Sequence, residues 1–133
     1  MIVDALDETV SKTITMKGIW DSSAVHTIAL FLKPGMKVLN LGPQTGLEAI
    51  IMGKIIGREG KMFLFEPYSS SFAIAKKNIF LNDLEDYTTL YKVGASDSQS
   101  ERKILVFPDN TGGAVKVTLP DAVAFVASVT VTE

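Results

Sequence analysis

The sequence contains no cysteine and only one histidine, His26, among its 133 residues. Without cysteine the chain has no disulfide framework, no thiolate zinc site and no cysteine nucleophile. One imidazole also excludes any site built from several histidines. Chemistry in this chain therefore depends on carboxylates, amides, hydroxyls and backbone groups.

Excess positive charge and long apolar runs are also lacking. The chain has 13 Lys and Arg against 15 Asp and Glu, with a formal net charge of −2, and its basic residues form no stripe suited to phosphates or anionic lipid. No run reaches 18 uncharged apolar residues, and residues 1–7 carry acids where a signal peptide carries bases. We expect no nucleic-acid partner, no direct membrane insertion and a cytoplasmic location.

What the sequence does have is enough apolar material for one core. Apolar residues make up 47% of the chain, and the 10 Gly and 5 Pro are scattered, as in an ordinary folded domain of this length. Residues 1–20 show no sustained hydrophobic period and are predicted to form an arm. A single domain is expected over residues 21–133.

Helical and strand-like patterns alternate along the first two thirds of the chain. Helices are expected at about 22–32, 47–57 and 69–82, with Asp21 as the cap of the first and Ser69, Ser70 and Ser71 as candidate caps of the third. Strands are expected at 36–41, 61–65 and 88–93. This order predicts an α/β fold, a Rossmann-like doubly wound and mainly parallel sheet, with the last two helices on one face.

In the last third of the chain, the alternation of predicted helices and strands ends. Strand-like runs at 103–107 and 114–119 flank a loop at 108–113 and are predicted to pair antiparallel. The end is compatible with a short helix at 122–126 and a strand at about 129–133. That strand would pair with 36–41 as the fourth of a truncated sheet, and its exposed edge favours a second copy of the chain or a partner subunit.

One motif lies where two of the predicted strands end. Gly42 and Gly46 join a strand to a helix, and Glu66 ends the next strand 20 residues after Gly46. Glycines let a ligand approach the backbone, the helix N-terminus offers free N–H groups, and the acid accepts hydrogen bonds from ribose hydroxyls. The spacing favours an adenosine-containing ligand over plain turn glycines. A third hypothesis, an oxidoreductase that binds a nicotinamide dinucleotide, is much less favoured. Glu48 occupies the position where such proteins usually have a third glycine, and its charge would repel the diphosphate.

The segment 33–46 (KPGMKVLNLGPQTG) resembles the FkbM-type family of class I S-adenosylmethionine-dependent methyltransferases. The resemblance extends over about residues 32–113. Its further motifs are 57–61, Phe65-Glu66-Pro67, Lys77-Asn78, Leu81-Asn82 and 110–113.

The resemblance implies S-adenosylmethionine as the cofactor. Gly42 and Gly46 would line its methionine part, Glu66 would hold both ribose hydroxyls, and Ser96 and Asp97 would lie near the adenine. The full set of candidate cofactor-binding residues is Asn40, Gly42, Gln44, Gly46, Glu66, Pro67, Ser96 and Asp97. The resemblance assigns no catalytic residue and no metal ligand.

The chain departs from the family pattern at three positions. Asn40 replaces an acid that helps to hold the ammonium group of the cofactor, Pro43 removes a backbone donor, and Val131 stands where a strand-end acid is usual. Two hypotheses follow: a methyltransferase domain that performs O-methyl transfer in a complete enzyme, or a catalytically inactive structural or interaction subunit. His26 is expected at the surface, and Trp20 is expected to pack the arm or, alternatively, to cover the cofactor pocket.

Overall fold

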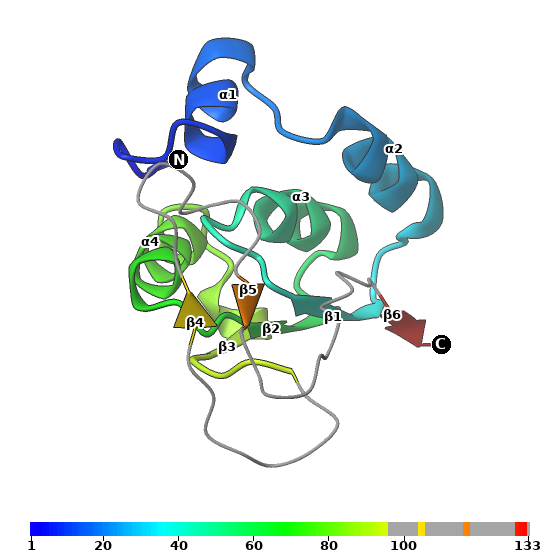
Figure 1. Cartoon of the computed structure of the whole chain (residues 1–133). Helices are drawn as coiled ribbons and strands as arrows, with labels where there is room; N and C mark the ends of the chain where they lie inside the picture. Colours follow the sequence, from blue (N-terminus) through cyan, green and yellow to red (C-terminus); the bar gives the residue numbers. More distant parts are fainter. Residues whose placement is uncertain (96–103, 106–115, 118–129, 133) are drawn as a thin grey trace.

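A four-stranded sheet forms the centre of the chain (Figure 1), whose computed structural model describes residues 1–95, 104–105, 116–117 and 130–132. The strand order is β3-β2-β1-β6. The strands are β1 (Lys37–Leu41), β2 (Lys61–Phe65), β3 (Thr88–Tyr91) and β6 (Thr130–Thr132). Strands β1, β2 and β3 pair in parallel, which confirms the predicted α/β fold.

Helices join the parallel strands at the predicted places. They are α2 (Ser22–Phe31), α3 (Leu47–Ile56), α4 (Ser69–Phe80) and the 3-10 helix η1 (Glu85–Tyr87). Asp21 caps α2 as expected, because its Oδ1 accepts a hydrogen bond of 3.0 Å from the Ala24 N–H. The serine caps predicted for α4 are wrong: Tyr68 is the N-cap and no side chain caps this end, because the chain enters the helix directly after the Glu66 turn. Helices α3 and α4 lie on the same side of the sheet (Figure 1).

The first 20 residues are more regular than predicted. They contain α1 (Val10–Lys17), whose Val10 and Ile14 are buried. The Asp7 carboxylate accepts hydrogen bonds from the Thr9 and Ser11 N–H groups, at 3.1 and 2.7 Å, and so satisfies donors at the start of the helix. With apolar residues at only two positions of its inner face, this short helix gives almost no periodic signal. The division into an arm and a domain remains a prediction.

The fourth strand pairs with β1, as predicted, but runs in the opposite direction. Lys37 faces Thr132 and Leu39 faces Thr130 in an antiparallel register. A run of β-branched residues favours a strand but carries no information about its direction. The predicted antiparallel pair in the last third also forms, between β4 (Ile104–Leu105) and β5 (Lys116–Val117). The predicted helix at 122–126 lies outside the described residues.

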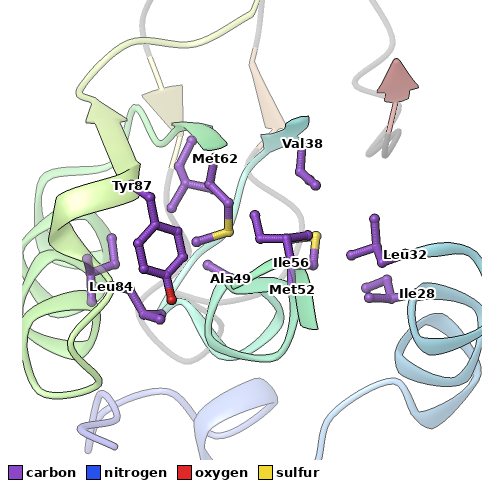
Figure 2. Packing of buried hydrophobic residues seen from close by; sticks show 11 residues of the cluster. Ile28, Leu32, Val38, Ala49, Met52, Ile56, Met62, Leu84 and Tyr87 are labelled. Atoms are coloured by element: carbon purple, nitrogen blue, oxygen red, sulfur yellow. The ribbon is translucent and has the colours of Figure 1, made fainter. Parts of the chain in front are cut away.

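The core lies between the sheet and the helices. Alternate residues of β1 and β2, including Val38 and Met62, are buried against α3, and Figure 2 shows them facing Ile56 and Met52. Further members of the cluster are Ile28, Leu32, Ala49, Leu64, Ile79, Leu84 and Tyr87. Within the ranges described above, no helix is both long and apolar enough to cross a membrane. This packing fixes where the strands end, and therefore where the loops that follow them meet.

Candidate functional site

The carboxyl ends of β1 and β2 bring the predicted motif residues together. The Gly42 N–H donates to the Phe65 carbonyl at 2.9 Å, and the Glu66 N–H donates to the Tyr91 carbonyl at 2.9 Å. The backbone ladder therefore continues one residue past each strand. Gly42 and Glu66 lie next to each other at the sheet edge where α/β folds bind their ligands.

The loop from Gly42 to Gly46 turns sharply into α3. Gly42, Gln44 and Gly46 all have positive φ, at 77°, 52° and 90°, a region that favours glycine. The two glycines have different surroundings. A Cβ at Gly42 would meet open space, whereas one at Gly46 would lie 3.5 Å from the Ala75 Cα on α4. Gly42 therefore leaves room for a ligand, whereas a Cβ at Gly46 would make only ordinary contact with α4, so a glycine is favoured there by its positive φ.

Glu66 is 3% exposed, and its carboxylate binds the backbone on two sides. Its Oε2 accepts from the Gln44 N–H at 3.0 Å and its Oε1 from the Tyr68 N–H at 2.9 Å. Burial raises the pKa of Glu66, and the two hydrogen bonds offset part of that rise. A carboxylate offers about four acceptor sites. Each oxygen of Glu66 therefore keeps about one acceptor site for a ligand.

A second polar pair lies beside the loop. Asn40, at 3% exposure, has a buried Nδ2 without a hydrogen-bond partner in the described part of the chain. Glu48, in the first turn of α3, is half-buried. Burial is the main reason why the pKa of Glu48 is raised; the nearby Asn40 amide lowers it in part, and the Asp21 carboxylate raises it further. A buried donor without a partner is destabilising, and such a group in a folded protein needs an explanation, of which a bound water or ion is one.

Asn78 is a site residue that the sequence analysis did not assign. Fully buried on α4, it donates from Nδ2 to the Ile2 and Thr45 carbonyls, both at 2.7 Å, and accepts at Oδ1 from the Ile2 N–H at 2.6 Å. Asn78 therefore ties the amino-terminal segment to the loop after β1. The sequence feature that could have identified Asn78 is its position three residues after Ala75, on the core face of the helix, where a polar side chain needs a hydrogen-bond partner.

The structure brings six of the eight candidate residues together. These are Asn40, Gly42, Gln44, Gly46, Glu66 and Pro67. Ser96 and Asp97 lie outside the described residues. His26 is exposed, as expected, and Trp20 is half-buried ahead of α2. Over the described ranges, no three His, Asp or Glu side chains are grouped as a metal site would need.

Comparisons with known proteins identify the family and the fold. The chain is 30% identical over 84 residues to a protein-L-isoaspartate O-methyltransferase of Methanothermobacter thermautotrophicus, which covers 59% of this chain and 39% of the relative. The chain thus spans about two fifths of the length of that relative.

Two solved structures share the fold. A candidate rRNA-methylase from Clostridium thermocellum is 26% identical, with a TM-score of 0.53 over 57% of this chain and 44% of its own. A SAM-dependent O-methyltransferase from Thermotoga maritima is 21% identical, with a TM-score of 0.51 over 60% of this chain and 32% of its own. These likenesses support the Rossmann-like methyltransferase fold.

The family model for protein-L-isoaspartate(D-aspartate) O-methyltransferase matches residues 6–129, which is nearly the whole chain. The match includes both strand ends of the candidate site and the loop between β1 and α3. The chain belongs to the protein-L-isoaspartate(D-aspartate) O-methyltransferase family.

Proposed function

We propose that this chain is the S-adenosylmethionine-binding part of an O-methyltransferase. The observation that carries the proposal is the state of Glu66, whose carboxylate is buried at a strand end and keeps about one free acceptor site on each oxygen. The two neighbouring hydroxyls of a ribose are two donors at matching positions. Glu66 would therefore bind the ribose while its other acceptor sites hold the backbone.

The other residues at this edge also suit the cofactor. The open space at Gly42 admits a ligand close to the backbone. The Asn40 Nδ2, which has no hydrogen-bond partner within the residues that the structure describes, offers a donor. When bound, S-adenosylmethionine supplies a methyl group on a positively charged sulfur, which an acceptor oxygen displaces. The contribution of this chain is to bind and orient that group, since correct placement accounts for much of the rate in such a transfer.

The family suggests the class of acceptor. The curated relative is described as acting on protein L-isoaspartate, and we propose a side-chain carboxyl group of a protein as the acceptor of the complete enzyme. A carboxylate is already ionised at neutral pH. Its methylation therefore needs no general base on the enzyme, which fits the absence of an assigned catalytic residue.

The narrower resemblance to FkbM-type enzymes remains a proposal. It depends on Phe65-Glu66-Pro67 and on the spaced asparagines Asn78 and Asn82. In the structure Asn82 Nδ2 donates to the Asn78 carbonyl at 2.8 Å, and the Asn78 side chain binds the loop after β1. The Asn78 contact positions the loop whichever acceptor the enzyme uses.

A catalytically inactive subunit is the second candidate, favoured by the direction of β6. A parallel fourth strand would add its carboxyl end to the site, whereas β6 directs its amino end there.

The amino-terminal segment is bound to Asn78 on α4, while β6 lies beyond β1, so this segment does not cover the β6 edge. We propose self-association or a partner at that edge, and sedimentation of a stable 14 kDa monomer at micromolar concentration would contradict it.

Titration calorimetry with S-adenosylhomocysteine tests the leading proposal. We expect micromolar binding to the parent chain, weakened roughly 10- to 100-fold in Glu66→Gln, because hydrogen bonds to a charged group contribute about 1.5–3 kcal/mol. Glu59→Gln, at an exposed acid, is the matched control and should bind like the parent. No binding by the folded parent at millimolar ligand would refute the proposal and support the inactive subunit.

A further inference from the structure

The side chain of Asn78 is shared between two segments that are far apart in the sequence. Its Oδ1 accepts a hydrogen bond from the Ile2 N–H at 2.6 Å, and its Nδ2 donates to the Ile2 and Thr45 carbonyls, both at 2.7 Å. These partners fix the orientation of the amide group, because exchanging Oδ1 and Nδ2 would place a donor against the Ile2 N–H and an oxygen against two carbonyls. One planar group therefore positions both segments on α4.

The amino-terminal segment, residues 1–17, also has internal contacts of its own. The Ser11 Oγ accepts a hydrogen bond from the Asp4 N–H at 3.1 Å. Val10 and Ile14 of α1 are buried, but they lie outside the core cluster between the sheet and the helices. Figure 1 shows α1 on the same side of the sheet as α3 and α4. The segment is therefore a small unit that can separate from α4 while the core stays packed.

The other end of the connection, Thr45, lies in the loop that turns from β1 into α3. The residue before it, Gln44, has a φ of 52°, which is a strained conformation for a residue other than glycine. Such a conformation persists only where neighbouring groups hold it. The Glu66 carboxylate binds the Gln44 N–H at 3.0 Å, and Asn78 binds the next carbonyl along the chain. The shape of the loop therefore depends in part on Asn78.

We propose that Asn78 is a positioning residue that couples docking of the amino-terminal segment to the shape of the loop. While the segment is docked, the N–H and the carbonyl of Ile2 hold the Asn78 amide so that Nδ2 points at Thr45. When the segment separates, the amide loses two of its three hydrogen bonds and turns more freely, so it holds the loop less tightly.

The same coupling extends to a ligand at the loop, and this step rests on the proposed function. A ligand that requires the ordered loop binds more tightly when the segment is docked. By linkage, the bound ligand favours the docked segment by the same factor. The factor is limited to about the effect of one hydrogen bond, which is roughly two- to tenfold in affinity.

Amide hydrogen exchange, measured residue by residue by NMR, tests the coupling without any ligand. Ile2→Pro removes the N–H that donates to Asn78, whereas Ile2→Ala keeps both backbone groups and is the matched control. We expect Ile2→Pro to speed exchange of the Gly46 amide, which donates to the Pro43 carbonyl within the loop, by roughly two- to tenfold. The Gly57 amide, at the other end of α3, should keep the parent rate in both variants.

Titration calorimetry with S-adenosylhomocysteine tests the extension to the ligand. Ile2→Pro should bind roughly two- to tenfold more weakly than the parent, and Ile2→Ala should bind like the parent. In Asn78→Ala, where the connection is already missing, adding Ile2→Pro should leave the affinity unchanged. The Ile2 variants alone provide the measurement if Asn78→Ala folds poorly.

Trypsin cleavage measures the coupling in the opposite direction. Lys17 ends α1 and is exposed, and the bond after it becomes open to the protease when the segment separates and unfolds. Saturating S-adenosylhomocysteine should slow this cleavage roughly two- to tenfold in the parent, and by less in Ile2→Pro.

The outcomes separate this inference from the proposed function. Equal exchange of the Gly46 amide in Ile2→Pro and Ile2→Ala, or a rise that the Gly57 amide shares, would refute the coupling whether or not a ligand binds. If the folded parent does not bind S-adenosylhomocysteine, the proposed function is wrong, and the exchange rates still decide whether the segment and the loop are coupled. Faster Gly46 exchange together with unchanged affinity would refute the extension to the ligand. A selective rise in Gly46 exchange with a matching loss of affinity supports the whole inference.

Discussion

Asn78 joins the amino-terminal segment to the loop at the candidate site, and Asn78→Ala measures how much this connection stabilises the protein. The substitution removes three hydrogen bonds, two with Ile2 and one with the Thr45 carbonyl. At about 0.5–1.5 kcal/mol each, the loss is roughly 1.5–4.5 kcal/mol. We expect the upper part of that range, because Thr45 is buried and its carbonyl would lose this partner.

Urea unfolding followed by circular dichroism gives the free energy of unfolding of each variant. Asn82→Ala, just after the end of the same helix, is the matched control, since it removes one hydrogen bond to the Asn78 carbonyl from a half-buried position, and should lower stability by less than about 1.5 kcal/mol. If the two substitutions have equal effects, the three contacts of Asn78 do not stabilise the fold as argued.

A double-mutant cycle isolates the contact with the amino-terminal segment. Ile2→Pro removes the N–H that donates to Asn78 Oδ1, and any strain introduced by proline is present in both backgrounds and cancels. Ile2→Pro should therefore destabilise the parent by about 0.5–1.5 kcal/mol more than it destabilises Asn78→Ala. Additive effects would show that the amino-terminal segment is not held by this side chain.

Two other predictions follow from close packing and from charge burial. Gly60→Ala should destabilise the chain by more than about 2 kcal/mol, since the new Cβ would lie 2.7 Å from the Met36 carbonyl oxygen and 2.8 Å from the Ile56 side chain; Gly53→Ala should have a smaller effect, because its Cβ would meet only movable side-chain ends at 3.0 Å. Burial raises the pKa of Glu66 in the folded chain above the ordinary 4.5, so the parent should lose stability relative to Glu66→Gln as the pH rises from about 4.5 through that higher pKa. Urea unfolding at a series of pH values checks the second, and a parent that gains stability over this range relative to the variant would contradict it.

The parts of the fold that sequence could predict are those fixed by local signals. The strand at 61–65 has the predicted bounds, and α3 begins at Leu47 as predicted, because the apolar runs there are bounded by glycine or proline. Gly57 ends α3 with a φ of 67° and donates to the Gly53 carbonyl at 3.0 Å. The proximity of Gly42 and Glu66 could also be predicted, because neighbouring parallel strands end at the same edge of the sheet.

The parts that sequence could not predict depend on contacts between distant segments. The direction of β6 is set by tertiary pairing with β1. The hydrogen bonds that Asp7 accepts at the start of α1 involve only local residues, but the helix also depends on the burial of Val10 and Ile14. The hydrogen bonds between Asn78 and Ile2 cross 76 positions of the sequence. None of these contacts leaves a periodic pattern that a linear reading would detect.

The electrostatic effect of Asn40 depends on the residues near it in space. In the sequence, Asn40 replaces the charged residue that the resembled family has at this strand end. In the structure Glu48 lies beside it, so the pair carries one negative charge in total. Asn40 is 3% exposed whereas Glu48 is half-buried, and a carboxylate is less destabilising where it keeps more contact with water.

This placement predicts the result of returning an acid to the strand end. Asn40→Asp alone would put two carboxylates side by side, with Asp21 close to one of them, and should lower the melting temperature at pH 7 because like charges in a partly buried site repel. Adding Glu48→Gln removes one charge and should recover most of the loss. Asn40→Leu, which introduces no charge, controls for damage to packing. Equal melting temperatures of Asn40→Asp with and without Glu48→Gln would show that positions 40 and 48 do not interact electrostatically, and the argument for a shared charge would fail.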